Sequence, residues 1–418
     1  QEKDNDTTME LDHRAFTGFM EENNLSISSN GVLYNNDKKG IIPEILETWF
    51  AQRVEYKNTM KKYVNEGNKE LAEYYDRRQH IQKIFLNSLY GVLGLPVFRF
   101  YDVDNAAAVT ISGQDVIKST AKVVNKHYER LLGEEKDYVV YIDTDSIYAS
   151  SKPLLADQDP KQFTIELARE MESKLNNFYN VFAKKAFNCN QHKLYIKGES
   201  VASTGFWVVK KRYTLDKVYD LETNQDVTKM VVKGLDVVRS SFPKAFREFM
   251  SQILKDILKR VQKDVIDEKI LMFSKSLVER DFLDIARNTS ANNISEYTLH
   301  DVPGLKAFKK GAPVHVKAAI VYNRLLEKFS IGDRYEPIMD GEKIKYVYLK
   351  TNPYQIDALA VKGYQDPPQI IEMVKEYIDT EALFENELRN KLDDFYNALN
   401  WGNIPTEVNQ NASDWFAF

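Results

Sequence analysis

The sequence contains a single cysteine, Cys189, among its 418 residues. One thiol cannot form an intrachain disulfide, and it cannot build a cysteine-based metal site. The six histidines show no HExxH spacing, which argues against a zinc hydrolase. No apolar run approaches the ~18 residues of a transmembrane helix, and the polar, acidic stretch 1–13 has no signal-peptide pattern. These absences favour a globular protein of a reducing compartment with no membrane partner.

The sequence also lacks an excess of positive charge. The formal net charge is −5 and the isoelectric point is about 5.9. A protein that coats nucleic acid is usually basic, but local basic clusters can supply phosphate contacts on an acidic chain. The length predicts two or three domains rather than one core. Because the first residue is Gln1 rather than Met, we expect a piece of a longer protein or a processed product.

Familiar nucleotide and calcium motifs are missing as well. Neither GxxxxGK[ST] nor GxGxxG occurs. The stretch 102–105 begins like an EF-hand loop, but its sixth position is Ala107 rather than Gly and its twelfth is Gly113 rather than Glu. The sequence therefore offers no P-loop, no dinucleotide-binding fold and no EF-hand.

Two long helical patterns are present early in the chain, after a hairpin signal at Asn30-Gly31. The first runs from about residue 41 to Gly67, which supplies a stop, and the second runs from the cap residue Asn68 to about Tyr90. A short connection between two such helices predicts an antiparallel helical hairpin. Further along the chain, Gly133 is expected to end another helix, the stretch 192–220 is β-rich, and 268–288 has helical periodicity.

This hairpin carries a set of phosphate-binding side chain types. Arg53 and Lys57 share one face of the first helix, and Lys83 and Asn87 share one face of the second. Arg, Lys and Asn donors on adjacent helices suit a triphosphate. For any one of these residues alone, an ordinary solvated helix face is the better interpretation. Tyr90 follows on the second helix, and Gly91 either permits close approach of a ligand or ends the helix.

The stretch 139–150, VVYIDTDSIYAS, predicts a strand, a turn and a second strand. In an extended chain, residues two apart face the same side, so Asp143 and Asp145 are expected to converge. Two close carboxylates repel unless a cation lies between them, and Mg²⁺ binds such oxygen ligands. An ordinary solvent-exposed turn made of Asp, Thr, Asp and Ser explains the same sequence equally well.

Basic residues cluster in the second half of the sequence. Lys210, Lys211 and Arg212 follow an apolar strand and suit a phosphate backbone, or they mark a charged edge strand that resists aggregation. Ser240, Ser241 and Lys244 lie at a helix start, where either phosphate binding or simple capping explains them. A third cluster comprises Lys306, Lys309, Lys310 and Lys317.

These elements, in this order, resemble the family B replicative DNA polymerases of the T-even bacteriophage type. KIFLNSLYG at 83–91 looks like the fingers motif K-x-x-x-N-S-x-Y-G, and YIDTDSIY at 141–148 looks like the palm motif D-T-D-S. KKRY at 210–213 looks like the primer-template motif. The similarity extends over most of the chain, from about Asn30 onward.

The resemblance implies an α+β fold with right-hand architecture. It comprises helical-hairpin fingers, an antiparallel β-sheet palm with helices and a mostly helical thumb. The implied regions are 1–40 as a remnant of the palm, 41–95 as fingers, 96–235 as palm, 236–400 as thumb and 401–418 as a sliding-clamp-binding tail.

The resemblance also implies roles for individual residues. Asp143 and Asp145 would belong to a site for two Mg²⁺ ions, with Glu199 a nearby palm carboxylate. Arg53, Lys57, Lys83 and Asn87 would hold the incoming dNTP, Lys83 would protonate the leaving pyrophosphate, and Tyr90 and Gly91 would lie against the nascent base pair. The implied DNA-binding residues are Lys210, Lys211, Arg212, Tyr213, Ser240, Ser241 and Lys244, and the implied clamp anchors are Trp415, Phe416 and Phe418.

One expected motif is missing. The family's other palm motif, D-x-x-S-L-Y-P-S, supplies a further metal-binding aspartate and does not occur here, and no D-x-E exonuclease motif occurs in a suitable context. We therefore expect the C-terminal half of a DNA-directed DNA polymerase that is inactive without an N-terminal portion, in the cytoplasm of an infected bacterial host if it is from a phage. The alternatives are a non-catalytic DNA- and clamp-binding accessory protein and a nuclease, although a nuclease has no need of a triphosphate surface.

Overall fold

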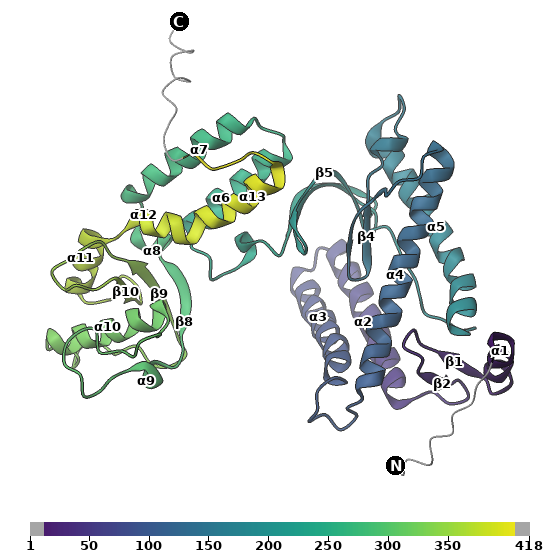
Figure 1. Ribbon diagram of the computed structural model, residues 1–418, viewed down its shortest axis with the longest axis horizontal. Coiled ribbons are helices and arrows are strands. Elements are labelled where there is room, and N and C mark those ends of the chain that lie inside the picture. Colours follow the sequence, from purple (N-terminus) through teal and green to yellow (C-terminus); the bar gives the residue numbers. More distant parts are fainter. Residues whose placement is uncertain (1–11, 406–418) are drawn as a thin grey trace, which may run out of the picture. The chain divides into compact units, whose positions relative to one another are not determined.

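The computed structural model describes residues 12–405 and divides the chain into two compact units, 1–199 and 200–418. The fold is mixed α+β with small antiparallel sheets, as the sequence predicts (Figure 1). The division falls inside 96–235, the region that the sequence assigns to the palm. Within residues 12–405, no helix is long and apolar enough to cross a membrane.

The first unit is mostly helical. Its elements are α1 (His13–Glu22), β1 (Leu25–Ile27), β2 (Leu33–Asn35), α2 (Ile41–Asn65), α3 (Lys69–Val92), α4 (Val103–Leu132), β3 (Val139–Asp143), β4 (Ser146–Ala149), η1 (Lys152–Leu154) and α5 (Pro160–Phe187).

Local sequence signals set the ends of these helices. The Asn68 side chain accepts a hydrogen bond from Leu71 N and caps α3, and Gly67 before it has a φ of 74°. Gly133 ends α4 in the left-handed conformation. The hairpin expected at Asn30-Gly31 is also present, since β1 pairs with β2 around that turn. These predictions are confirmed.

The core of the first unit lies between α4, α5 and the β3–β4 hairpin. Val124, Tyr128 and Leu175 are 2–3% exposed, and the Tyr179 hydroxyl bonds to Thr120 Oγ1 at 2.8 Å. By contrast, α2 buries no residue and α3 buries only Ala72. The α2–α3 hairpin is therefore held mainly by contacts between its own two helices, which lie side by side (Figure 1).

The second unit combines two three-stranded sheets with helices. Its elements are β5 (Ser200–Val209), β6 (Arg212–Asp220), β7 (Gln225–Lys233), η2 (Asp236–Val238), α6 (Lys244–Leu258), α7 (Lys263–Ser276), η3 (Leu277–Glu279), α8 (Phe282–Ile285), β8 (Arg287–Ala291), α9 (Ile294–Tyr297), α10 (Val314–Lys328), β9 (Glu342–Tyr348), β10 (Ala358–Val361), α11 (Pro368–Tyr377), α12 (Thr380–Leu383), the π-helix η4 (Phe384–Arg389) and α13 (Asn390–Leu399).

The sheets are antiparallel, in the orders β5-β6-β7 and β10-β9-β8. The large core packs α6, α10 and α13 against them, and Phe246, Leu254 and Leu325 are fully buried there. This core is far larger than that of the first unit, so the second unit has the greater apolar contribution to stability.

Two sequence interpretations differ from the structure. Helical periodicity was expected through residues 268–288, but α7 ends at Ser276, Asp281 caps the short α8, and β8 begins at Arg287. The stretch 192–198, expected to be β-rich, forms no strand. Instead, the Asn176 side chain bonds both the N–H and the carbonyl of Ile196, and this replaces a strand neighbour.

Candidate functional site

Asp143 and Asp145 lie at the tip of the β3–β4 hairpin. Asp143 is the last residue of β3 and pairs with Ser146, while Thr144 and Asp145 form the two-residue turn. Thr144 has a φ of 58° and donates its hydroxyl to the Asp143 carboxylate at 3.3 Å. The alternation rule for an extended strand therefore does not apply to this pair, and the turn sets the separation of the two carboxylates. Asp143 is half-buried and Asp145 is exposed.

The two carboxylates at the hairpin tip are candidate metal ligands. Carboxylate oxygens fit a hard divalent cation, and Mg²⁺ commonly uses one or two of them. Among residues 12–405, however, no group of three His, Cys, Asp or Glu side chains lies close enough to hold a metal ion. Glu199 is exposed at the end of the first unit and is not gathered with the two aspartates. A complete carboxylate cluster thus needs a further ligand or a rearrangement.

The α2–α3 hairpin is joined along a seam of paired residues. Trp49 contacts Phe85 with ring centroids 5.5 Å apart, and Gln82 Nε2 donates to Gln52 Oε1 at 2.8 Å. Arg78 lies over the Tyr56 ring at 5.5 Å. These three contacts define the register between the antiparallel helices.

The register relates the four predicted phosphate ligands to one another. Each residue adds about 100° of rotation. Arg53 directly follows the seam residue Gln52 and Lys83 directly follows Gln82, so this rotation is expected to turn both toward the same side of the hairpin. Lys57 and Asn87 each lie four residues further on, along the same helix faces. Helix geometry therefore predicts that the quartet shares one face of the hairpin.

The register also fixes how far apart the four predicted phosphate ligands lie along the hairpin axis. In this register Asn87 lies at the level of Glu47, and Lys57 lies nearest the tip, so the set spans roughly 15 Å. Helical side chains tilt toward the helix N-terminus, which directs Lys57 and Lys83 toward each other from opposite ends. Arg53 Nε is buried without a hydrogen-bond partner, whereas Lys83 and Asn87 are exposed. This face can gather several donors around one elongated anion.

Tyr90 and Gly91 lie at the end of α3. Tyr90 is 36% exposed. Because α3 continues to Val92, Gly91 does not end the helix, and a Cβ placed there would meet no atom within 4 Å. Both positions are open to a ligand.

The basic residues at the end of β5 do not all have the exposed positions that the sequence interpretation implies. Lys210 and Lys211 form the exposed β5–β6 turn, with Lys211 at a φ of 65°. Arg212 instead donates to Asp394 Oδ2 at 2.7 Å and lies 3.6 Å from Asp236. Sequence reasoning missed these two carboxylates because they are distant in the chain and carry no motif.

Tyr213 is 2% exposed and belongs to the interior of the β5–β7 sheet. Of the predicted DNA-contacting set KKRY, the structure therefore exposes the two lysines, half-buries Arg212 and buries the tyrosine.

Ser240, Ser241 and Lys244 lie before and at the start of α6. The residue that precedes α6 is Pro243, and no side chain caps the helix, so neither serine acts as its cap. Both serines are exposed, and Lys244 Nζ lies 3.2 Å from Asp284. The capping interpretation is wrong for this helix. The predicted clamp anchors Trp415, Phe416 and Phe418 lie outside the described residues.

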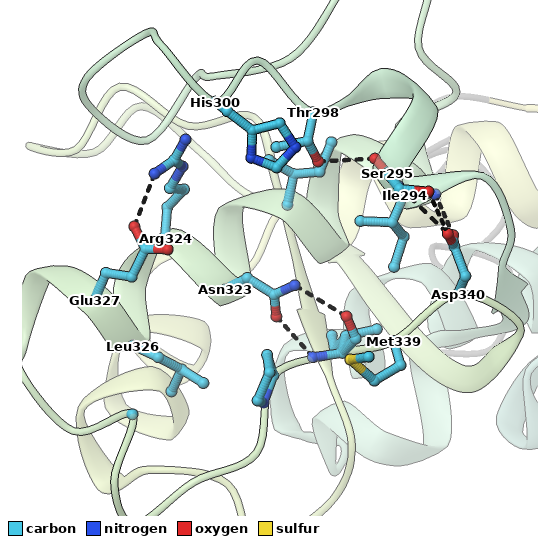
Figure 2. A pocket seen from close by; sticks show the side chains of 14 residues that line it. Ile294, Ser295, Thr298, His300, Asn323, Arg324, Leu326, Glu327, Met339 and Asp340 are labelled. Carbon is cyan, nitrogen blue, oxygen red and sulfur yellow. Dashed lines mark hydrogen bonds and ion pairs between the residues drawn. The ribbon is translucent and has the colours of Figure 1, made fainter.

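A cavity of about 420 Å³ lies in the second unit between α9, α10 and the segment before β9. Figure 2 shows that several of its polar side chains bond to one another or to the backbone, whereas His300 has no bond to another residue drawn there. Asp340 accepts from Ser295 Oγ at 2.6 Å, and Arg324 donates to Glu327 at 2.8 Å. Asn323 is joined to the backbone of Ile338 through both its amide atoms. These partners leave the cavity without a converging set of open donors, so it is not a catalytic candidate.

Comparison with known proteins shows the family of this chain. A family profile described as DNA polymerase family B matches residues 2–399. The chain belongs to the family B DNA polymerases.

Two phage relatives match most of the chain. The DNA-directed DNA polymerase of Enterobacteria phage T4 is 27% identical over 435 residues, covering 86% of this chain and 46% of the relative. That of Escherichia phage RB69 is 27% identical over 447 residues, covering 89% and 48%. The DNA polymerase alpha catalytic subunit of Mus musculus is 28% identical over 244 residues, covering 58% and 15%. The chain spans about half the length of the phage relatives it matches.

Proposed function

We propose that this chain provides the fingers, part of the palm and the thumb of a DNA-directed DNA polymerase. In this proposal it performs template-directed synthesis together with an N-terminal portion that supplies the missing palm aspartate. The observation that supports the proposal is the match of residues 2–399 to DNA polymerase family B, in a chain whose α2–α3 hairpin is joined at Gln52 and Gln82, the residues directly before Arg53 and Lys83. The regions are those that the sequence suggests, namely 41–95 as fingers, 96–235 as palm and 236–400 as thumb.

The proposed reaction joins a nucleotide to a primer. The primer 3′-hydroxyl gives its proton to solvent water, its oxygen forms a bond to the α-phosphorus of a dNTP, and the bond from that phosphorus to the oxygen that bridges to the β-phosphate breaks. Arg53, Lys57 and Asn87 bind and orient the triphosphate, and Lys83 donates a proton to the departing pyrophosphate. Charged donors held at fixed positions stabilise the charge that develops in this step.

Asp143 and Asp145 would hold the metal ions, with Asp145 as the surer direct ligand. Two bound Mg²⁺ ions supply charge neutralisation at the attacking and leaving oxygens. The exposed position of Asp145 in the turn leaves its oxygens open for this role. Because the described residues offer only a partial carboxylate cluster, the remaining ligand would come from the N-terminal portion.

The DNA contacts divide into two kinds. Lys210 and Lys211 are exposed on their turn and would bind the duplex backbone directly, as would Ser240, Ser241 and Lys244. Arg212 and Tyr213 would position that turn from inside the second unit. The aromatic tail would bind a sliding clamp in the host cytoplasm.

The test is primer extension with dNTPs and Mg²⁺ by the complete assembly of this chain and its N-terminal portion. Asp145→Asn should lower the rate at least about 100-fold, whereas the matched control Asp157→Asn, another exposed carboxylate of the first unit, should leave it unchanged. Removal of Mg²⁺ with a chelator should stop extension. Robust extension by this chain alone contradicts the need for a second portion. An assembly that binds primer-template DNA but never extends it indicates the accessory role instead.

A further inference from the structure

The connection between α3 and α4 is a closed, internally bonded loop. The N–H groups of Leu95, Phe98 and Tyr101 bond in turn to the carbonyls of Val92, Leu95 and Phe98, at 2.9–3.0 Å. The Asp102 N–H then donates a hydrogen bond to the Leu93 carbonyl at 3.0 Å, and this bond closes the loop. Leu93 is 9% exposed and anchors the base. The loop conformation therefore does not depend on burial of the side chains it projects.

Those projecting side chains are apolar. Val97 is 88% exposed, the most of any large apolar side chain among the described residues, and Val103 is 55% exposed. Three more apolar side chains of this stretch are exposed to 46%, 44% and 42%, namely those of Leu95, Phe100 and Tyr101. Scattered apolar side chains on a surface need no explanation, but five within nine residues, four in the loop and Val103 at the start of α4, mark an interaction site. These five residues are called the α3–α4 loop surface.

We propose that the N-terminal portion of the polymerase docks on the α3–α4 loop surface. In this contact, an apolar patch of the N-terminal portion covers Val97. This inference rests on the proposed function and names the contact that would complete the assembly. The loop directly follows Tyr90 and Gly91, so docking here would place the second portion beside the proposed nucleotide site.

The occupant follows from chemistry and chain length. Nucleic acid is a poor partner, because the loop offers one basic residue, Arg99, and is followed by Asp102 and Asp104, whereas phosphate contacts need basic side chains. The phage relatives extend for more than half of their length beyond the part that this chain matches. We expect a portion of that size to pack against this half, and the core of such an interface buries apolar surface.

The binding partner for the test is the polypeptide from the same source that matches the unmatched part of the phage T4 relative. Its affinity for the full 418-residue chain is measured by calorimetry, for the wild type and for Val97→Glu. The matched control is Val64→Glu, near the end of α2, where the valine is 59% exposed. Both valines are exposed, so neither substitution should unfold the chain. Melting followed by circular dichroism verifies this.

We expect Val97→Glu to weaken binding at least about 10-fold and Val64→Glu to change it less than about 2-fold. Amide exchange should slow in residues 95–103 when the partner is added. Equal effects of the two substitutions, or no binding by the wild type, overturn the inference. The inference is also overturned if Val97→Glu weakens the binding of primer-template DNA to the lone chain as strongly as it weakens the binding of the partner. A dimer of the chain that dissociates on Val97→Glu overturns it as well. A complex that forms through Val97 but never extends a primer refutes the proposed function and leaves the docking site standing.

Discussion

Gln82 donates a hydrogen bond from Nε2 to Gln52 Oε1 at 2.8 Å and so joins the two helices of the α2–α3 hairpin next to Arg53. The bond is partly buried, and the Gln82 oxygen and Arg53 Nε have no hydrogen-bond partner. A pair of helices with almost no buried residues depends on such seam contacts for its register.

The first prediction concerns this bond. Gln82→Leu removes the donor and leaves the Gln52 amide unpaired, so we expect the free energy of unfolding to fall by about 1 kcal/mol in urea titration. The matched control is Gln79→Leu, since Gln79 bonds only to Asp76 within its own helix and should change stability by a few tenths. Equal losses from both substitutions contradict a role of the seam bond.

The second prediction separates the lysines of the β5–β6 turn from Arg212. Lys210→Gln and Lys211→Gln should each reduce the slope of log affinity against log salt for primer-template DNA by about 0.9, because each removes one phosphate contact. Arg212→Gln should leave that slope unchanged and lower stability by up to about 1 kcal/mol, since its partners Asp394 and Asp236 are inside the same unit. An Arg212→Gln slope change equal to that of the lysines would show that the arginine contacts DNA directly.

The third prediction concerns Gly234, which has a φ of 66°. A Cβ at this position would lie 2.0 Å from the carbonyl oxygen of Lys211, so the backbone of the Lys210–Lys211 turn would have to move. Gly234→Ala should lower the free energy of unfolding by more than about 2 kcal/mol. Gly311→Ala is the control, because Gly311 also has a positive φ, 89°, but has open space around it and should cost about 1 kcal/mol. Thermal melting distinguishes the two outcomes.

The fourth prediction is a pH dependence in the β6–β7 region. The hydrogen bond from Lys217 at 2.7 Å, aided by backbone N–H groups, lowers the pKa of Asp220 to about 2. Because the pKa is lower in the folded than in the unfolded state, the stabilisation is complete above pH ~4 and disappears as the pH falls toward 2. Asp220→Asn should therefore destabilise the chain at pH 7 and converge with the wild type near pH 2. Parallel stability curves across this range would show that the pair contributes nothing.

Part of this structure was predictable because its signals are local. Asn68 and Gly133 determine helix ends through capping and left-handed geometry, which depend on a few neighbouring residues. The strand, turn and strand around Asp143 follow from β-forming residues that flank Asp and Thr. The end of α7 at Ser276 and the strand β8 were not predictable, because β8 exists through its pairing with β9, more than fifty residues later.

The sequence by itself determined the family, the helical hairpin and the residue types that a triphosphate requires, since each depends on motifs and helical spacing. Only the tertiary structure decided how those residues are used. It put Asp145 in a turn rather than on a strand face, paired Arg212 with Asp394, buried Tyr213 and left the α3–α4 loop surface exposed. The physical reason is that partners, burial and exposure arise from contacts between residues distant in the chain, and no short pattern encodes them.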